Sequence, residues 1–252
     1  MVKVDGLSKS VRKKPILTDL SFQLRAGDRL GLVGANGAGK SLLLKILATL
    51  VRPTTGTLLI NDQDAFSNLA TVRLSIGYLP QIFDEDLGLT VGGYLNFFAR
   101  AYGIDKSARS ALIEGTLELT DLSHLHRQNL AELSVGQRSR TVLAKTVLHD
   151  PQFWLLDDPL AQLDPQGQAE LGELIRELGQ MDKIVVLASN HLTMVQNICN
   201  RLAVLHQGRL VYFGSPPTDL LTSYNRLIRQ PTADNNNTPL PDPTNSEFEP
   251  EQ

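Results

Sequence analysis

RLGLVGANGAGKSLLLKIL, residues 29–47, runs from a short apolar segment through a glycine-rich loop into a helical pattern. Residues 30–33 form a continuous apolar run, which is typical of a strand buried on both faces of a parallel sheet. After the loop, Leu43, Ile46, Leu47 and Leu50 recur at helical spacing. This stretch therefore predicts a strand, a tight loop and a helix in direct succession.

The loop itself matches the pattern G-x-x-x-x-G-K-[ST] between a strand and a helix. Its glycines let successive backbone N–H groups converge on phosphate oxygens, and the start of the helix adds its dipole. Lys40 can reach the β and γ phosphates of a nucleotide, and the Ser41 hydroxyl can bind Mg²⁺. The predicted phosphate-binding residues, here called the phosphate loop, are Gly34, Ala35, Asn36, Gly37, Ala38, Gly39, Lys40 and Ser41.

The rest of the chain alternates short apolar runs with helical patterns, which predicts an α/β fold with a mostly parallel sheet. A different texture fills residues 82–150, where helical patterns follow one another with few strand signals. We therefore predict an α/β core from residues 1–81 and 151–229, with residues 82–150 inserted as a helical subdomain. Residues 230–252 are rich in Pro, Asn and acids and are predicted to be disordered.

Composition excludes several classes of protein. The five acids of residues 230–252 account for −5 of the formal net charge of −3, which leaves +2 for residues 1–229. A charge of +2 is too small to favour nucleic acid as a partner. The single cysteine allows no internal disulfide, and no apolar run approaches the ~20 residues of a membrane span. These features predict a cytoplasmic protein that reaches any membrane through a partner.

The segment FWLLDDP, residues 153–159, carries an apolar run into two adjacent aspartates. One interpretation is a strand that ends in a solvated turn, because Asp before Pro is common in turns. The other is a cation site, because Asp157 and Asp158 repel each other unless a positive charge lies between them. The phosphate loop favours the second interpretation, since a nucleotide site needs a metal-binding aspartate at the end of a strand.

Upstream of these aspartates, LSVGQ at residues 133–137 resembles the Leu-Ser-Gly-Gly-Gln signature of ABC-type ATPases. The resemblance covers about residues 2–215, and the landmarks follow the family's order. They are the phosphate loop, Gln81 after SIGYLP, the signature segment (residues 133–137), LLDD, AQLD, and ASNH with His191.

The resemblance implies a P-loop NTPase fold in which two chains dimerise head to tail around two ATP molecules. It implies that Ser134, Gly136 and Gln137 face the partner's γ-phosphate. The same S-x-x-Q spacing is also a helix capping box, and both roles can hold together.

The family pattern also implies two catalytic residues, Asp158 as general base and His191 at the γ-phosphate. Ser41, Gln81 and Asp157 would hold Mg²⁺, with ATP as the nucleotide. The segment LTVGGYLNFFARAYGI, residues 89–104, is similar to subunits that drive exporters.

Three positions depart from the family pattern. Asp158 stands where the family usually has Glu, and Val135 replaces a Gly of the signature. An aromatic residue that stacks on adenine is missing near Val11, and no aromatic precedes Phe22. These departures predict slow turnover rather than loss of ATP binding.

Two functions follow from the sequence. The first is an ATPase subunit that powers a membrane transporter, in complex with a permease and with itself or a homologous subunit. It would lie at the inner face of the plasma membrane. The alternative is an ATP-dependent clamp that regulates a partner with little hydrolysis. Asp158 and Val135 favour the clamp, whereas the order of the motifs and the exporter-like segment at residues 89–104 favour the transporter.

Overall fold

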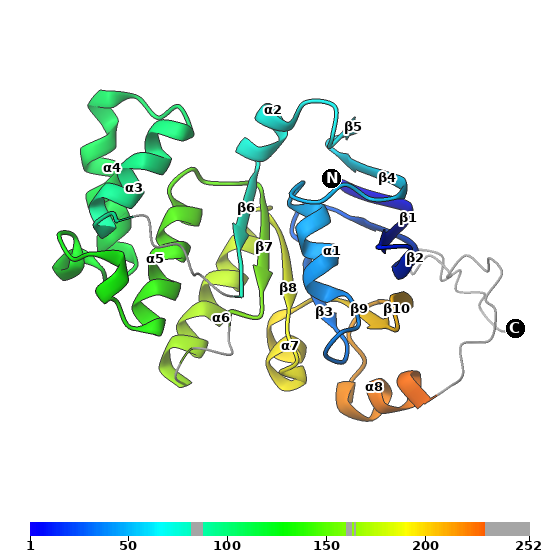
Figure 1. The fold of residues 1–252 in the computed structure, drawn as a ribbon. Coiled ribbons are helices and arrows are strands. Elements are labelled where there is room, and N and C mark those ends of the chain that lie inside the picture. The colour runs from blue at the N-terminus through cyan, green and yellow to red at the C-terminus, as the bar shows by residue number, and fades with distance from the viewer. Residues whose placement is uncertain (82–87, 160–162, 164, 230–252) are drawn as a thin grey trace, which may run out of the picture.

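The strand that leads into the phosphate loop lies inside a six-stranded sheet in the computed structural model of the chain (Figure 1). The structure describes residues 1–81, 88–159, 163 and 165–229. In spatial order the strands are β10 (Arg209–Gly214), β9 (Arg201–His206), β3 (Arg29–Val33), β8 (Ile184–Ala188), β7 (Phe153–Asp157) and β6 (Ile76–Leu79). All neighbours pair in parallel except β10 with β9. The predicted mostly parallel sheet is confirmed, and the carboxyl ends of its parallel strands meet at one edge.

Helices cover both faces of this sheet. On one face α1 (Lys40–Leu47) packs against Leu155 of β7, and on the other α6 (Pro165–Gln180) packs against Leu156. The helix α7 (Leu192–Ile198) lies on the same face as α6. Because adjacent residues of β7 serve different cores, every residue of that strand is buried, which explains its continuous apolar run.

A second sheet is antiparallel and was not predicted from the sequence. Its order is β2 (Lys14–Leu24), β1 (Val2–Val11), β4 (Thr55–Ile60) and β5 (Gln63–Asp64). The turn between β1 and β2 places Arg12 and Lys13 at φ values of 48° and 66°. Such turns usually carry Asn-Gly or Asp-Gly. Since this one does not, the hairpin has no signal in the sequence.

Helices fill the described part of the inserted segment. They are α3 (Val91–Ala101), α4 (Lys106–Leu119) and α5 (Val135–Val147), with the short turns η1 (Ser123–Leu125) and η2 (Leu130–Glu132). These helices enclose a hydrophobic core of their own, in which Tyr94 and Leu95 contact residues of α4 and α5. Phe97, on the other face of α3, is 55% exposed. In Figure 1 this group lies beyond β6, on the side away from α1.

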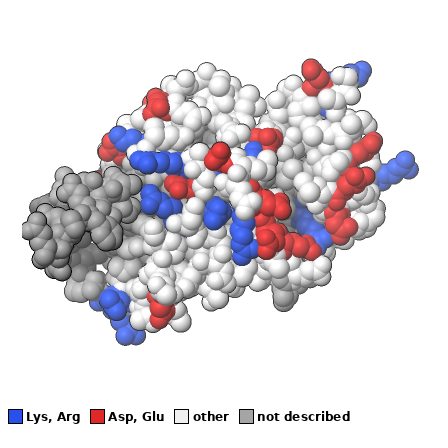
Figure 2. All heavy atoms as spheres, turned by 180° about the vertical axis from the view of Figure 1, so that it is seen from behind, with Lys and Arg blue, Asp and Glu red and all other residues white. Residues whose placement is uncertain are grey.

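Two further helices complete the described chain. They are α2 (Leu69–Leu74), which precedes β6, and α8 (Leu220–Arg229), which follows β10. The predicted disordered tail, residues 230–252, lies outside the described residues. Within the described ranges, no helix combines the length and apolar character needed to cross a membrane. On the face seen in Figure 2, basic and acidic side chains are interspersed, in keeping with the weak net charge.

Candidate functional site

The phosphate loop connects the end of β3 to the start of α1, as the sequence predicts. Gly39 occupies the N-cap position of α1 with φ 108°, a conformation that favours glycine. A Cβ on Gly34 would overlap the carbonyl oxygen of Leu205 in β9. Only glycine therefore allows the loop to approach that strand so closely. Gly37, at φ 80°, is also in the left-handed region, so backbone geometry and close packing account for all three loop glycines.

Asp157 ends β7 directly opposite the start of α1. Its Oδ1 accepts a hydrogen bond of 2.9 Å from Ser41 Oγ, and its Oδ2 accepts one of 3.4 Å from Tyr78 OH. The residue is only 4% exposed. The buried carboxylate and the Ser41 hydroxyl therefore form a pair of oxygen donors, which is the chemistry that suits Mg²⁺.

Asp158 lies one residue beyond the strand and points into a different set of contacts. Its backbone N–H donates to Ala188 O at 2.8 Å, which continues the pairing of β7 with β8. Its carboxylate accepts hydrogen bonds from Ser189 Oγ at 3.3 Å and from Gln81 Nε2 at 3.5 Å. The φ of Asp158 is 49°, in the left-handed region where Asp is tolerated better than most residues.

The local backbone explains how two like charges can follow an apolar strand. The backbone turns at Asp158, so the two carboxylates contact different partners. Burial raises the pKa of the Asp157 carboxyl, and the hydrogen bond from Ser41 opposes that rise. Burial also lowers the pKa of Lys40, and the two aspartates oppose this fall. Carboxylates and an ammonium group with shifted pKa values in one hollow make this site a candidate for binding a phosphate and a cation together.

Asn190 also lines this site, and it is not among the residues predicted from the sequence. Its Oδ1 accepts a hydrogen bond of 2.8 Å from Lys40 Nζ, and its Nδ2 donates one of 2.8 Å to Asn36 Oδ1. The signal was present, because Asn190 directly precedes His191 after β8. Tyr78 was missed as well, since nothing in SIGYLP shows that its hydroxyl faces Asp157.

The structure brings most of the predicted residues of the core around one hollow of about 470 Å³. It is lined by Ile16, Asn36, Gly37, Gly39, Lys40, Ser41, Leu42, Gln81, Asp157, Asp158 and Asn190. His191 does not line it in this structure. That residue is exposed at the N-cap of α7, where its backbone N–H donates to Ser189 Oγ at 3.1 Å.

The signature segment lies elsewhere, at the start of α5. Ser134 is the N-cap, and Ser134 and Gln137 each accept a hydrogen bond from the other's backbone, so the predicted capping box is confirmed. Val135 is 61% exposed. The N–H groups of Val135 and Gly136 lie in the first turn, where an α-helix has no carbonyl to bond them. The N-terminal turn of α5 therefore has backbone N–H groups that could bind an anion from outside the chain.

Ser134, Gly136 and Gln137 line a separate hollow of about 390 Å³. None of its described lining residues also lines the hollow at the phosphate loop. Figure 1 shows the reason, because α5 packs beside β6 while α1 packs near β7 and β8. The signature segment and the phosphate loop of one chain thus line separate hollows.

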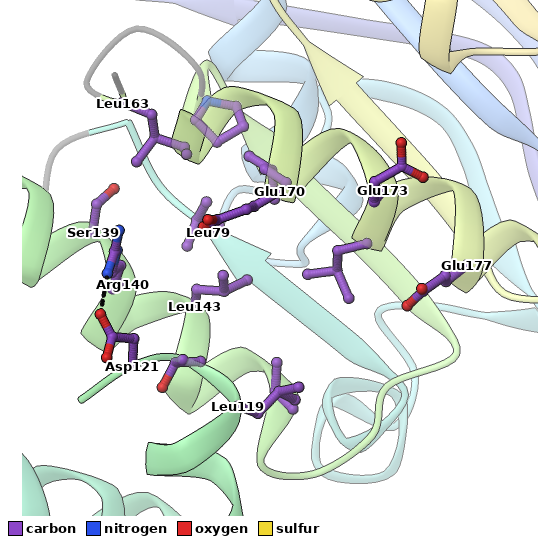
Figure 3. A pocket seen from close by; sticks show the side chains of 16 residues that line it. Leu79, Leu119, Asp121, Ser139, Arg140, Leu143, Leu163, Glu170, Glu173 and Glu177 are labelled. Carbon is purple, nitrogen blue, oxygen red and sulfur yellow. Dashed lines mark hydrogen bonds and ion pairs between the residues drawn. The ribbon is translucent and has the colours of Figure 1, made fainter. Parts of the chain in front are cut away.

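Another hollow, of about 380 Å³, lies between α5 and α6 (Figure 3). Apolar side chains such as Leu79 and Leu143 form its floor, and Glu170, Glu173 and Glu177 line the α6 side. Three carboxylates beside an apolar floor would repel a triphosphate. This hollow is therefore a poor candidate for the nucleotide.

Comparison with known proteins decides the class of this site. A family model described as ABC transporter matches residues 17–161. The chain belongs to the ABC transporter family. It is an ATP-binding subunit of the ABC type, and the enzymatic activity of that domain is ATP hydrolysis.

Individual relatives agree with this family. The chain is 32% identical over 211 residues to Nod factor export ATP-binding protein I of Burkholderia lata. The matched region covers 84% of this chain and 69% of the relative. It is 32% identical over 215 residues to the protein of the same name from Rhizobium meliloti strain 1021, covering 85% of this chain and 64% of that relative. Both are named as export proteins, so this ABC subunit is homologous to an exporter ATPase.

Solved structures show the same ABC fold. An ATP-binding subunit of an ABC transporter superposes with a TM-score of 0.79 and 25% identity, over 91% of this chain and 95% of the other. The cbiO1 protein of Clostridium perfringens, described as part of the transporter complex cbiONQ, superposes with a TM-score of 0.74. Its identity is 23%, over 89% of this chain and 92% of the other, so it supports the fold alone.

The residues near the phosphate loop that could contact the adenine of ATP lead to a first prediction. Ile16 of β2 lines the hollow, while Val11 is 45% exposed at the end of β1, and neither has a π face for adenine. Stacking of a base on an aromatic side chain contributes ~1–3 kcal/mol. We expect GTP to bind within about tenfold of ATP, a gap of ~1.4 kcal/mol. Calorimetry with both nucleotides measures this ratio.

Two variants locate the base. Val11→Tyr is expected to tighten ATP binding, because the family resemblance implies an aromatic residue near this position, while Ile16→Tyr serves as the matched change on the neighbouring strand. If only Ile16→Tyr increased the affinity for ATP, the adenine base would be assigned to a position beside β2 rather than beside the end of β1. No gain for either variant would contradict the view that the missing aromatic limits adenine recognition.

Proposed function

We propose that this ABC subunit binds ATP with Mg²⁺ and powers a membrane exporter by dimerising head to tail around two ATP molecules. The observation that carries the proposal is the separation of the two half-sites within one chain. The phosphate loop and the signature segment line different hollows. A second copy, or a homologous subunit, would therefore supply the signature segment to each phosphate loop.

The proposed roles follow from the contacts at each half-site. The phosphate loop holds the triphosphate, with Lys40 at the β and γ phosphates. Ser41, Asp157 and Gln81 would hold Mg²⁺, and the cation would neutralise phosphate charge in this class of reaction. Asp158 would take the proton from the attacking water, and His191 would approach the γ-phosphate when the loop after β8 moves. From the partner, the start of α5 would present its N–H groups to the same phosphate.

The chain is divided accordingly. Residues 1–81 and 151–229 form the nucleotide-binding core in this proposal, and residues 82–150 form the subdomain that carries the signature segment. The exporter branch is supported by the relatives named as Nod factor export proteins. A permease would supply the membrane spans and hold this subunit at the inner face of the plasma membrane.

One observation favours a second candidate, a clamp that binds ATP with little hydrolysis. Asp158 already contacts Ser189 and Gln81, so its shorter carboxylate is engaged within its own chain. Phosphate release distinguishes the two functions. Turnover stimulated by a co-purified permease supports the transporter, whereas ATP-dependent dimers without phosphate release support the clamp.

The dimer gives a second prediction. We expect the chain to sediment as a monomer alone and as a dimer with a non-hydrolysable ATP analogue. Ser134→Asp should abolish this dimer and leave ATP binding to the monomer intact. Aspartate caps helices as well as serine does, so α5 is kept. Its charge, however, would face the partner's γ-phosphate.

Two controls accompany this experiment. Ser134→Thr retains an uncharged cap and should still dimerise. Ser134→Arg removes the cap, which costs about 0.5–2 kcal/mol of stability, and adds bulk, so it should also fail to dimerise. A wild-type chain that stays monomeric at high concentration with the analogue would contradict self-association and indicate a different partner subunit.

A further inference from the structure

The ammonium group of Lys40 has three hydrogen-bond acceptors within its own chain. An ammonium carries three N–H donors. In the structure Lys40 Nζ lies 2.7 Å from Gly34 O, 3.3 Å from Ala35 O and 2.8 Å from Asn190 Oδ1. A phosphate oxygen can therefore bond to Lys40 only if one of these three acceptors gives way.

The three acceptors differ in how easily they can move. Gly34 O and Ala35 O are backbone groups of the phosphate loop, and Ala35 O also accepts a hydrogen bond of 3.1 Å from Ala38 N–H. Moving either carbonyl would distort the loop that must hold the phosphates. Asn190 is an exposed residue of the loop after β8, and its acceptor is a side-chain oxygen. Rotation of that side chain releases Lys40 without changing the phosphate loop.

The side chain of Asn190 also makes a hydrogen bond to a second residue of the phosphate loop. Its Nδ2 donates to Asn36 Oδ1 at 2.8 Å, so one amide group bridges Lys40 and Asn36. These residues belong to the phosphate loop, whereas Asn190 is 150 positions further along the chain than Lys40. The bridge therefore ties the phosphate loop to the segment after β8.

We propose that Asn190 is a positioning residue that bridges Lys40 and Asn36 in the nucleotide-free protein and is displaced by the β and γ phosphates. The inference rests on the proposed role of the phosphate loop. It goes beyond that role because it makes Asn190 a competitor of the nucleotide rather than a ligand. The bridge gives the Lys40 ammonium a side-chain acceptor on Asn190.

Displacement of Asn190 would be transmitted to the catalytic residues through its two neighbours. Ser189 Oγ donates to Asp158 Oδ1 at 3.3 Å, and His191 N–H donates to Ser189 Oγ at 3.1 Å. A displacement of Asn190 that also moves its backbone would therefore act on a segment that contacts Asp158 and carries His191, which does not line the hollow.

The test compares nucleotides that differ in the phosphates they carry. We expect Asn190→Ala to bind ATP and ADP about fivefold more tightly than the wild type, because one competing hydrogen bond is removed. AMP should bind equally to both proteins, since it has no β or γ phosphate to reach Lys40. Asn190→Asp should weaken ATP by tenfold or more, because a carboxylate would pair with Lys40 and repel the phosphates. Calorimetry with Mg²⁺ measures all three nucleotides.

Asn197→Ala, a change at an asparagine of α7 outside the hollow, is the matched control and should leave every affinity unchanged. Thermal unfolding of each variant checks that the fold is retained. Weaker ATP binding by a folded Asn190→Ala would overturn the proposal, because Asn190 would then be a nucleotide ligand. Unchanged ATP binding in that variant would overturn it too. If wild-type protein bound no ATP at all, the proposed role of the phosphate loop would fail instead.

Discussion

Replacing Lys40 with alanine is expected to weaken ATP binding by at least about 100-fold. Lys40 is half-buried at the start of α1, and we propose that its ammonium binds the β and γ phosphates. Hydrogen bonds to charged groups contribute ~1.5–3 kcal/mol each, so the loss of two of them corresponds to about 3 kcal/mol or more. Each ~1.4 kcal/mol is tenfold in affinity. Calorimetry with Mg²⁺ and ATP measures the change.

Two further measurements separate charge from folding. Lys106→Ala removes an exposed lysine of α4, far along the chain, and should bind ATP as the wild type does. Thermal unfolding should show that Lys40→Ala is folded, although its phosphate loop loses three hydrogen bonds. Wild-type affinity in a folded Lys40→Ala protein would mean that the nucleotide binds elsewhere.

Changes at Asp158 are expected to alter hydrolysis in both directions. Asp158→Asn should abolish phosphate release and accumulate an ATP-bound dimer, because an amide cannot accept the proton from water. Asn tolerates the left-handed backbone at this position, so the fold should be unaffected. Steady-state phosphate release and sedimentation with ATP measure the two effects.

Asp158→Glu should raise the turnover number. Aspartate is one methylene shorter than glutamate, which sets its carboxylate back by ~1.5 Å, and a misplacement near 1 Å can cost ~100-fold in rate. In the wild type we expect a bridging water to give slow but real turnover. Glutamate is less favourable at φ 49°, so some loss of stability should accompany the gain. Slower phosphate release by a folded Glu variant would show that the site is built around the shorter side chain.

The antiparallel sheet shows where sequence patterns stop being informative. Its strands β1 and β2 alternate buried and exposed residues only in part, because their pairing shifts register at several points. The hairpin turn uses Arg12 and Lys13 in left-handed conformations, which these residues rarely adopt. Packing of the sheet against α1 stabilises this arrangement, and packing against a distant helix leaves no local pattern in the chain.

The sequence by itself determined the features that depend on residue types at short, covalently fixed spacing. They include the phosphate loop between β3 and α1, the pair of aspartates at the end of β7 and the capping box of α5. A strand followed by a helix must present its loop at the edge of a parallel sheet, so the nature of this site could be predicted.

Only the tertiary structure decided which of these local features meet. Ser41 and Asp157 are 116 residues apart, and Lys40 and Asn190 are 150 apart, yet each pair is hydrogen-bonded because β3, β7 and β8 lie side by side. The signature segment lines a different hollow because α5 packs beyond the edge strand β6. Strand order and helix packing depend on burying apolar surface from distant parts of the chain, and no local spacing encodes them.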